Sequence, residues 1–298
     1  MFKSGIITIL GRPNQGKSTL INTLVGEKVA IVSWRPQTTR DKIVGIMNGE
    51  DYQAVFIDTP GIHNAKNDLS HYMMKNVESA EDGVDIVIYV VSVDKKMDAT
   101  DEAYIAKYAK KNIPFIVVIN KCDTVKPEQI LKRIEYFSTR MEGITAVIPV
   151  SALTGKNVDL LKEEIVKHLP EGEMLYPEDM FTDKNLRFMV GEIVREKAMR
   201  FLGDEVPYGI GVAIDRFDER DDGVVEIDAT IICDKKAHKP IIIGNKGEMI
   251  KRISTTARLD MEELLGTKVF LNVWVKVKEE WRDSSSALRE LGYDVKDI

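Results

Sequence analysis

The sequence has no apolar run of the length that spans a membrane, and it is poor in cysteine and histidine. A membrane-spanning helix needs about 20 consecutive apolar residues, so we expect no transmembrane segment. The two cysteines, Cys122 and Cys233, are far apart, which favours free thiols in a reducing cytosol over a disulfide. The histidines are too scattered to suggest a metal cluster: His63, His71, His168 and His238. The first apolar run begins close to Met1 and leaves no room for a signal peptide, so we expect a cytoplasmic protein.

The size and composition of the chain favour two domains. With 298 residues, of which 44% are hydrophobic, each half is large enough to bury a core of its own. The net charge of −6 argues against a generally basic nucleic-acid-binding surface. That value is an average over modules whose charges can differ, so the charge of each module matters separately.

A predicted phosphate-binding loop follows the first apolar run, residues 6–10. It matches the GxxxxGK[ST] pattern that binds a nucleoside triphosphate between a strand and a helix, and its residues are Gly11, Arg12, Pro13, Asn14, Gln15, Gly16, Lys17 and Ser18. The glycines let backbone N–H groups face the β-phosphate, Lys17 reaches the β- and γ-phosphate oxygens, and Ser18 offers a hydroxyl to Mg²⁺. A helix that starts near Thr19 points its positive end at the same anion. An ordinary glycine-containing turn is the alternative, but the flanking strand and helix favour a nucleotide site.

Three later motifs indicate which nucleotide binds. Asp58-Thr59-Pro60-Gly61 has the spacing of a carboxylate that reaches Mg²⁺ and a glycine N–H that contacts the γ-phosphate. Asn120-Lys121-Cys122-Asp123 and Ser151-Ala152 look like the guanine-recognition motifs of the GTPase superfamily. Asp123 can accept from guanine N1–H and its amino group, Lys121 would lie along the base, and the Ser151-Ala152 backbone would approach O6. All three motifs end apolar runs, and open α/β sheets bind ligands at the carboxyl ends of strands, so we predict a GTP site.

Two polar segments have the positions of GTPase switches. In the first, residues 34–41, Thr39 is the predicted second hydroxyl on Mg²⁺, Thr38 is the less favoured choice, and a plain surface loop is the alternative. The second is residues 63–68, which we expect to be ordered by the γ-phosphate. Ile62 stands where many GTPases have a glutamine that orients water. We therefore assign catalysis to Lys17, Thr39 and Gly61, and metal binding to Ser18, Thr39 and, through water, Asp58.

The second half of the chain has the pattern of an RNA-binding module. We assign residues 1–172 to the GTPase domain, 173–184 to a Pro- and acid-containing linker, and 185–298 to this module. Its element order, αββααβ, matches a type II KH domain whose Gly-x-x-Gly loop is Gly244-Asn245-Lys246-Gly247. Residues 235–252 carry six Lys/Arg and one acid, a net +5. The predicted RNA-binding residues are Lys235, Lys236, Lys239, Ile243, Gly244, Asn245, Lys246, Gly247, Lys251 and Arg252.

Together, GRPN-x-GKST, PQTTRD, DTPGIH, NKCD and VSA resemble the Era family within the TrmE–Era–EngA group of bacterial GTPases. The resemblance covers essentially the whole chain. It implies an α/β P-loop GTPase domain, with a mostly parallel sheet and helices on both faces, followed by an α+β KH domain. It also implies Mg²⁺-dependent hydrolysis of GTP to GDP, binding near the 3′ end of 16S ribosomal RNA, assistance to assembly of the small (30S) subunit, and peripheral membrane contact. Because no residue is an evident water-orienting base, we expect slow intrinsic hydrolysis that a partner or RNA accelerates. We expect a monomer.

Two alternatives stay open: a KH RNA-binding protein with a structural, non-cycling nucleotide site, and a GTPase partner of an RNA-modification enzyme. Gln15 departs from the small apolar residue that is usual in the family, and its side chain is expected beside the nucleotide or in solvent. Trp274 is expected in the core because it lies in an alternating strand, whereas Trp281 is left unassigned.

Overall fold

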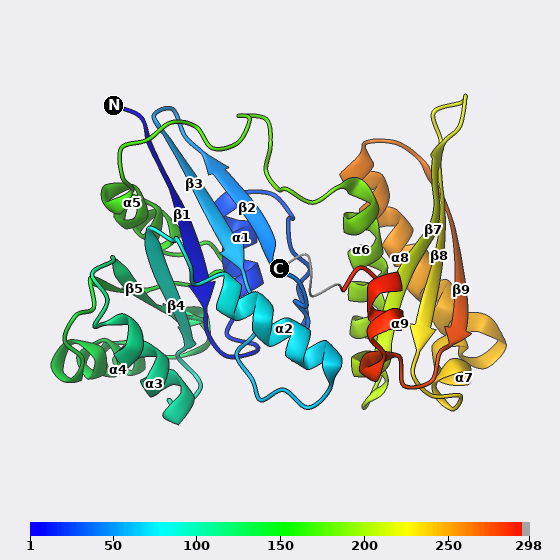
Figure 1. The fold of residues 1–298 in the computed structure, drawn as a ribbon, viewed down its shortest axis with the longest axis horizontal. Coiled ribbons are helices and arrows are strands. Elements are labelled where there is room, and N and C mark those ends of the chain that lie inside the picture. Colours follow the sequence, from blue (N-terminus) through cyan, green and yellow to red (C-terminus); the bar gives the residue numbers. More distant parts are fainter. Residues whose placement is uncertain (294–298) are drawn as a thin grey trace. The chain divides into compact units, whose positions relative to one another are not determined.

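The computed structural model describes residues 1–293, which fold into two compact units (Figure 1). The first unit consists of Met1–Val32, Thr39–Asn64 and Met73–Asp183. The second consists of Ser33–Thr38, Ala65–Tyr72 and the chain from Lys184 onward. The second unit therefore includes two short segments that come from the predicted switch regions.

The first unit is built on a six-stranded sheet with the order β2-β3-β1-β4-β5-β6. All neighbouring strands are parallel except β2 and β3, which are antiparallel. The central strand β4 is buried along its whole length, as expected for a parallel strand covered on both faces. The strands are β1 (Lys3–Leu10), β2 (Ile43–Asn48), β3 (Tyr52–Asp58), β4 (Ile86–Ser92), β5 (Phe115–Asn120) and β6 (Ala146–Pro149).

Helices cover both faces of this sheet, which confirms the predicted fold class. On one face, Ile105 and Phe137 from two helices pack with Tyr89 and Val117 of the sheet. On the other face, α1 and α5 contact each other and β3. The helices are α1 (Lys17–Val25), α2 (Asp68–Ser79), α3 (Ala99–Tyr108), α4 (Pro127–Arg140) and α5 (Val158–His168), with a short η1 (Cys122–Thr124).

The predicted linker is tied to the edge of this sheet rather than extended into solvent. The Gln53 side chain accepts hydrogen bonds from the backbone N–H groups of Leu175 and Tyr176 at 2.7 and 2.9 Å, and it donates to Tyr176 O at 2.8 Å. Ile46 N donates to Phe181 O at 2.9 Å. These bonds hold the segment from Leu175 to Phe181 against β2 and β3.

The second unit has the predicted order αββααβ. Its three-stranded sheet pairs β7 with β8 in antiparallel and β8 with β9 in parallel orientation. Its main elements are α6 (Leu186–Phe201), β7 (Ile210–Glu219), β8 (Val225–Cys233), α7 (His238–Ile243), α8 (Glu248–Leu265) and β9 (Val269–Val277). The shorter ones are η2 (Val206–Gly209), η3 (Asn245–Gly247), η4 (Trp281–Asp283) and α9 (Ser285–Glu290).

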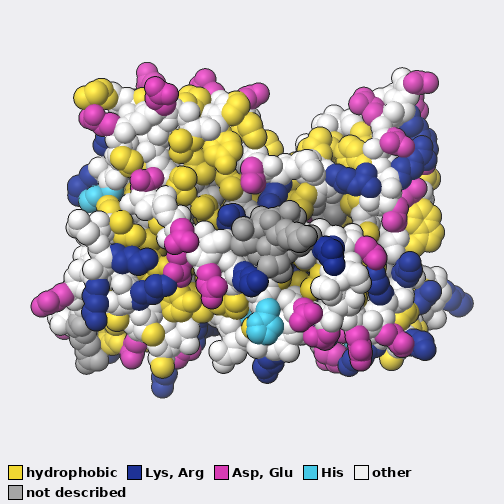
Figure 2. Space-filling view, viewed as in Figure 1, with side chains coloured by type: hydrophobic (Ala, Val, Ile, Leu, Met, Phe, Trp, Pro, Cys, Tyr) yellow, Lys and Arg dark blue, Asp and Glu magenta, His cyan; other side chains and the backbone are white. Residues whose placement is uncertain are grey.

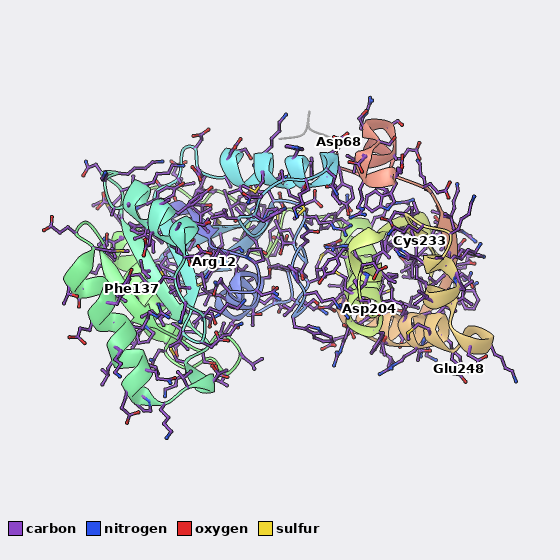
Figure 3. All side chains as sticks on the ribbon, turned by 90° about the horizontal axis from the view of Figure 1, so that it is seen from below. Arg12, Asp68, Phe137, Asp204, Cys233 and Glu248 are labelled. Carbon is purple, nitrogen blue, oxygen red and sulfur yellow. The ribbon has the colours of Figure 1, made fainter. Side chains whose placement is uncertain are left out.

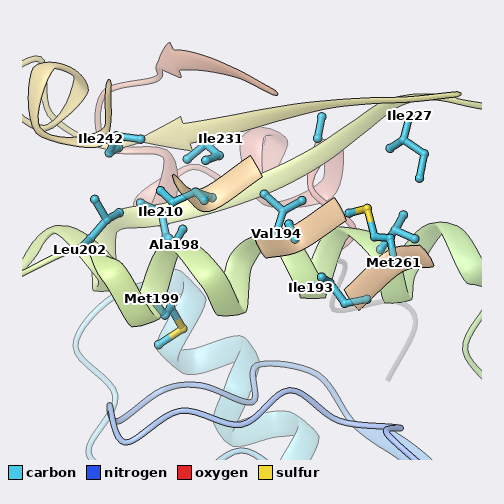
Figure 4. Packing of buried hydrophobic residues seen from close by; sticks show 14 of the residues in the cluster. Ile193, Val194, Ala198, Met199, Leu202, Ile210, Ile227, Ile231, Ile242 and Met261 are labelled. Carbon is cyan, nitrogen blue, oxygen red and sulfur yellow. The ribbon is translucent and has the colours of Figure 1, made fainter. Parts of the chain in front are cut away.

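The core of the second unit lies between one face of this sheet and helices α6 and α8 (Figure 4). Val194 and Ala198 of α6 meet Ile227 and Ile231 of β8, and Met261 of α8 completes the layer. Alternate residues of β8 and β9 therefore face the helices, and the residues between them face outward.

The two tryptophans of this region differ in burial. Our expectation that Trp274 lies in the core is wrong: its side chain is 51% exposed, because it lies on the outer face of β9. Trp281 is fully buried, and its Nε1 donates to Gly209 O at 3.0 Å. Trp281 thus anchors the C-terminal segment to the start of β7.

Candidate nucleotide site and RNA interface

The phosphate loop has the backbone that its glycines predict. Gly11 and Gly16 have φ angles of 144° and 91°, in the region that favours glycine. A Cβ atom at Gly11 would lie 2.5 Å from Val90 O, and one at Gly16 would lie 2.3 Å from Asn120 Nδ2. The loop is therefore closely packed against the ends of β4 and β5, and both positions exclude any larger residue.

Lys17 lies inside this loop. Its ammonium donates to Gly11 O at 2.9 Å and to Arg12 O at 3.3 Å, and the side chain is buried. Burial lowers the pKa of Lys17 from 10.5 to about 8, against the opposing attraction of Asp58. Among the described residues, the Lys17 ammonium bonds only to carbonyl oxygens. A buried cation in such a setting gains from an anion, which a nucleotide phosphate provides.

Arg12 has a different role in the same loop. Arg12, which Figure 3 labels, forms an ion pair with Asp98 and another with Asp101, the latter at 2.8 Å, and it donates to Lys96 O at 2.8 Å. These contacts direct the Arg12 side chain to the start of α3. They therefore attach the phosphate loop to the segment between β4 and α3.

Three oxygen-bearing side chains meet where the predicted metal site lies. Ser18 Oγ donates to Asp58 Oδ2 at 2.7 Å and lies 2.9 Å from Thr39 Oγ1. Thr39 Oγ1 lies 3.3 Å from the same carboxylate oxygen. Asp58 Oδ1 is buried without a hydrogen-bond partner among the described residues. Burial raises the pKa of Asp58, and Lys17 opposes that shift. Hydroxyl and carboxylate oxygens are the ligands that Mg²⁺ prefers, so the residues fit the ion.

Of the two neighbouring threonines, only Thr39 has its hydroxyl beside Asp58. Thr38 Oγ1 donates to Arg35 O at 2.7 Å and takes no part in the group around Asp58. Within the second unit, Arg35 Nε donates to Met199 O at 2.8 Å, and the buried Arg195 donates to Thr38 O. Sequence reasoning missed these arginine contacts, because no local pattern connects residue 35 with a helix more than 150 residues away.

The base-recognition residues are joined to the phosphate loop by hydrogen bonds. Asn120 Nδ2 donates to Gln15 O at 2.9 Å, and Asn120 Oδ1 accepts from Ala152 N at 3.0 Å. Lys121 Nζ donates to Asn14 O at 2.8 Å. A single asparagine side chain therefore connects the phosphate loop with the segment after β6.

Asp123 is positioned by its neighbour. Ser151 Oγ donates to Asp123 Oδ1 at 2.6 Å, and Asp123 itself is exposed. A carboxylate held in this way matches the two neighbouring donors of guanine.

Gln15 is not where we expected it. Its side chain is 1% exposed, and its Oε1 accepts a hydrogen bond from Ser92 N at the end of β4. It points neither to solvent nor along the open side of the loop, because the strand end offers an N–H group that the side chain can reach.

The segment after Asp58 also packs on the phosphate loop. Ile62 is 6% exposed, its N–H donates to Gly11 O at 3.2 Å, and its side chain belongs to the hydrophobic core. A Cβ at Gly61 would lie 2.7 Å from Pro13. His63 Nδ1 lies 2.6 Å from Gly61 O. Ile62 is thus a packing residue here, in keeping with its inability to bind water.

The Gly-x-x-Gly loop begins where α7 ends. Gly244 and Gly247 have φ angles of 77° and 81°, and Lys246 has a φ of 47°. A Cβ at Gly244 would lie 2.6 Å from Met249 Cβ, so the loop turns closely onto α8. Asn245 and Lys246 are exposed at the turn, and Ile243 is partly buried beside it.

The predicted basic residues lie before α7, within it, in the loop and in the first turns of α8, and all are exposed. Lys236 lies 3.5 Å from Glu279, and the guanidinium of Arg252 stacks over Phe201 at 4.1 Å. The exposed set is Lys235, Lys236, Lys239, Lys246, Lys251 and Arg252. Exposed cations beside a glycine turn suit a phosphate backbone that approaches closely.

Below the loop, the start of α7 is fixed by a buried polar group. His238 Nδ1 lies 3.0 Å from Asp234 Oδ1, and Arg282 donates to the other oxygen of the same carboxylate. Asp234 N in turn donates to Gly209 O. This group connects the basic loop to the C-terminal segment, and the sequence offered no signal for it.

Comparisons with known proteins agree with a GTPase domain in the first half of the chain and a KH domain in the second. A family model described as 50S ribosome-binding GTPase matches residues 6–121, and a KH domain model matches residues 205–282. GTPase Era of Clostridium botulinum strain Kyoto is 50% identical over 293 residues, which cover 98% of this chain and 99% of that protein. GTPase Era of Clostridium kluyveri is 49% identical and is covered completely. The chain belongs to the Era family of GTPases.

Solved Era structures extend this likeness to the whole fold. Era in complex with MgGDPNP and nucleotides 1506–1542 of 16S ribosomal RNA is similar with a TM-score of 0.95 and 40% identity, over 99% of this chain and all of that one. A variant of Aquifex aeolicus Era bound to GDP·AlF4− is similar with a TM-score of 0.94 at the same identity and coverage. As an Era GTPase, the chain binds guanine nucleotide with Mg²⁺ and hydrolyses GTP.

Proposed function

We propose that this Era protein binds the 3′-terminal region of 16S ribosomal RNA through its KH domain and assists assembly of the small ribosomal subunit, with the bound nucleotide controlling RNA engagement. The observation that carries the proposal is the union of a complete guanine-nucleotide site with an exposed basic Gly-x-x-Gly loop in one chain. The solved relative in complex with nucleotides 1506–1542 supports the choice of RNA.

The proposed hydrolysis relies on positioning and charge. Ser18 and Thr39, and Asp58 through water, would hold Mg²⁺, which would neutralise charge at the phosphates. Lys17 and the loop N–H groups bind the β- and γ-phosphate oxygens, and Gly61 N contacts the γ-phosphate. The buried Ile62 side chain cannot orient the attacking water, so intrinsic hydrolysis is slow and RNA or a partner accelerates it.

The remaining site assignments follow the same proposal. The loop from Gly11 to Thr19, the motif Asp58 to Ile62, and Asn120, Lys121, Asp123, Ser151 and Ala152 bind GTP. The six exposed cations, Ile243 and the Gly-x-x-Gly loop bind RNA. We place the domain boundaries at residues 172 and 185.

We also propose that the protein is a cytoplasmic monomer with peripheral contact to the inner face of the membrane. Only the family resemblance supports the membrane contact. Among residues 1–293, no helix has both the length and the apolar character needed to cross a bilayer.

Single-turnover GTP hydrolysis tests the enzymatic part of the proposal. We expect slow turnover by the protein alone and faster turnover with an RNA of the sequence 1506–1542 bound. Fast turnover without RNA would contradict the proposal. Hydrolysis too slow to detect with or without RNA would favour a structural nucleotide site instead.

The salt dependence of RNA binding tests the interface. Replacing Lys239 and Lys246 together by Ala removes two phosphate contacts, so the slope of log K against log salt should fall by about 1.4 for single-stranded RNA. The matched control replaces Lys110 and Lys162 in the first unit, and its slope should not change. Equal slopes for the two double variants would exclude the Gly-x-x-Gly loop as the RNA site.

A further inference from the structure

Two aromatic side chains lie half exposed on the outer face of the KH sheet. Phe270 is 48% exposed and Trp274 is 51% exposed, and both belong to β9. They are four positions apart in the strand, so they share one face at a spacing of about 13 Å. Helices α6 and α8 pack on the opposite face. Pairs of exposed aromatic residues on one face are typical of interaction surfaces.

The register of the sheet shows what surrounds these rings. Thr230 of β8 is directly beside Trp274, and Ala213 of β7 is beside Thr230, so small side chains form a shallow ledge next to the indole. Glu226 is beside Phe270 in the same way. We call this surface the outer face and define it by Ala213, Arg216, Asp218, Glu226, Asp228, Thr230, Phe270, Asn272 and Trp274.

One end of the sheet is already covered by the chain itself. Gly211, one row beyond Ala213, lies under Trp281 and Leu291: a Cβ at Gly211 would be 3.4 Å and 3.0 Å from these side chains. Among residues 1–293, no helix covers the rows from Ala213 to Asp218. The outer face therefore lies next to the part of the sheet that Trp281 and Leu291 cover.

The β7 to β8 hairpin, which forms much of the outer face, has the reverse of the charge around the Gly-x-x-Gly loop. Residues 215–228 contain seven acids and two arginines, a net −5, whereas residues 235–252 carry a net +5. Figure 2 shows hydrophobic, acidic and basic side chains side by side on the outer side of the β7 to β9 sheet. A phosphate backbone is repelled by such a surface, and a basic protein segment is attracted to it.

The protein already shows how a cation binds here. The guanidinium of Arg220 lies 5.3 Å from the Phe270 ring centroid, and its Nε lies 3.1 Å from Glu226 Oε2. The cation is thus held between a ring and a carboxylate. Trp274 has no such cation among the described residues, although Asp215 lies close by, bonded to Thr230 Oγ1 at 2.6 Å.

We infer that the outer face docks a basic segment of another protein, which places an Arg or Lys side chain over Trp274 and an apolar side chain on the ledge formed by Ala213 and Thr230. The inference goes beyond the proposed RNA and GTP functions and does not depend on them. The aromatic rings supply contact area, and the acidic β7 to β8 hairpin selects the sign of the partner's charge.

Fluorescence anisotropy with a labelled peptide tests the inference on the full-length protein loaded with Mg·GDP. The probe is a 15-residue peptide of alternating Arg and Leu, and its charge-inverted counterpart has Glu for Arg. We expect the basic peptide to bind, the acidic one not to bind, and Trp274→Ala to weaken binding by about five-fold or more, which corresponds to the loss of one cation–π contact. Trp274→Phe retains a ring and should restore most of the affinity.

The matched control is Leu259→Ala, which removes a side chain that is also 51% exposed but lies on α8 of the same unit. Its affinity for the basic peptide should equal that of the unmodified protein. The inference is overturned if neither peptide binds, if the two peptides bind equally, or if Trp274→Ala binds the basic peptide unchanged. An oligouridine that binds with the same dependence on Trp274 would also overturn it, by assigning the outer face to RNA.

Discussion

The side chain of Gln15 accepts a hydrogen bond from the backbone N–H of Ser92, and both groups are buried. Ser92 is the last residue of β4, next to the point where β1 turns into the phosphate loop. The glutamine thus satisfies a strand-end donor from within the loop. Gln15, where the family resemblance leads us to expect a small apolar residue, thus attaches the phosphate loop to the end of β4.

We expect Gln15→Met to speed the dissociation of bound nucleotide. Methionine fills a similar volume but accepts no comparable hydrogen bond, so Ser92 N loses its partner at a cost of about 1–3 kcal/mol. GDP should dissociate about ten-fold faster, as measured by stopped-flow exchange of a fluorescent analogue. Gln129→Met, at an exposed glutamine on α4, is the control and should leave the rate unchanged. An unchanged rate for Gln15→Met would show that the Ser92 contact does not support the loop.

Asp123→Asn should change the base that the site selects. The amide keeps one acceptor but replaces the other by a donor, which suits the carbonyl at position 2 of xanthine and not the amino group of guanine. GTP affinity should fall by about 100-fold, in line with the loss of hydrogen bonds to a charged group. Titration with GTP and xanthosine triphosphate checks this. Asp159→Asn on α5 is the control, and equal GTP affinity for the two variants would refute the assignment.

Thr39→Ala should raise the Mg²⁺ concentration that hydrolysis requires, because Thr39 Oγ1 lies beside Ser18 Oγ and Asp58. We expect a change of about ten-fold or more. Thr38→Ala is the neighbouring control, since its hydroxyl bonds Arg35 O instead. Mg²⁺ titrations of GTP hydrolysis distinguish the two. A larger effect at Thr38 than at Thr39 would reverse the assignment.

Both cysteines should react slowly in the native protein. Burial raises the pKa of Cys122 and Cys233, so each thiol stays neutral at pH values where a free cysteine begins to ionise. Labelling with a maleimide at pH 8 should give two fast equivalents only in denaturant. As pH rises, the native rate should begin to increase later than that of a free cysteine. Fast labelling of either thiol in the folded protein would disagree with the burial seen here.

The sequence located the nucleotide site because strand ends and loop motifs are local signals. Lys17, Asp58 and Asn120 each end or follow an apolar run, and a parallel sheet brings such ends together. The order of the KH elements could also be predicted, because the patterns of its helices and strands are local signals. Trp274 was misjudged because β9 has large apolar residues on both faces, so alternation alone could not say which face the helices cover.

The contacts of Gln15 and Arg35 had no local signal. Gln15 finds its partner 77 residues away, and Arg35 finds a carbonyl 164 residues away. Such contacts depend on the tertiary fold, which brings residues far apart in the sequence together. The burial of Arg195 against Thr38 O is a further case, in which a charged residue of α6 serves the first switch segment.

The central claim of the proposed function is that nucleotide state controls RNA engagement. Thr38 bonds Arg195 of the KH core helix, and the next residue, Thr39, belongs to the group around Asp58. The most direct measurement is the affinity of the full-length protein for RNA 1506–1542, determined in parallel with GDP and with a non-hydrolysable GTP analogue. The account predicts tighter RNA binding with the GTP analogue, and a smaller difference in Arg195→Ala. Equal affinity of the unmodified protein in the two nucleotide states would contradict it.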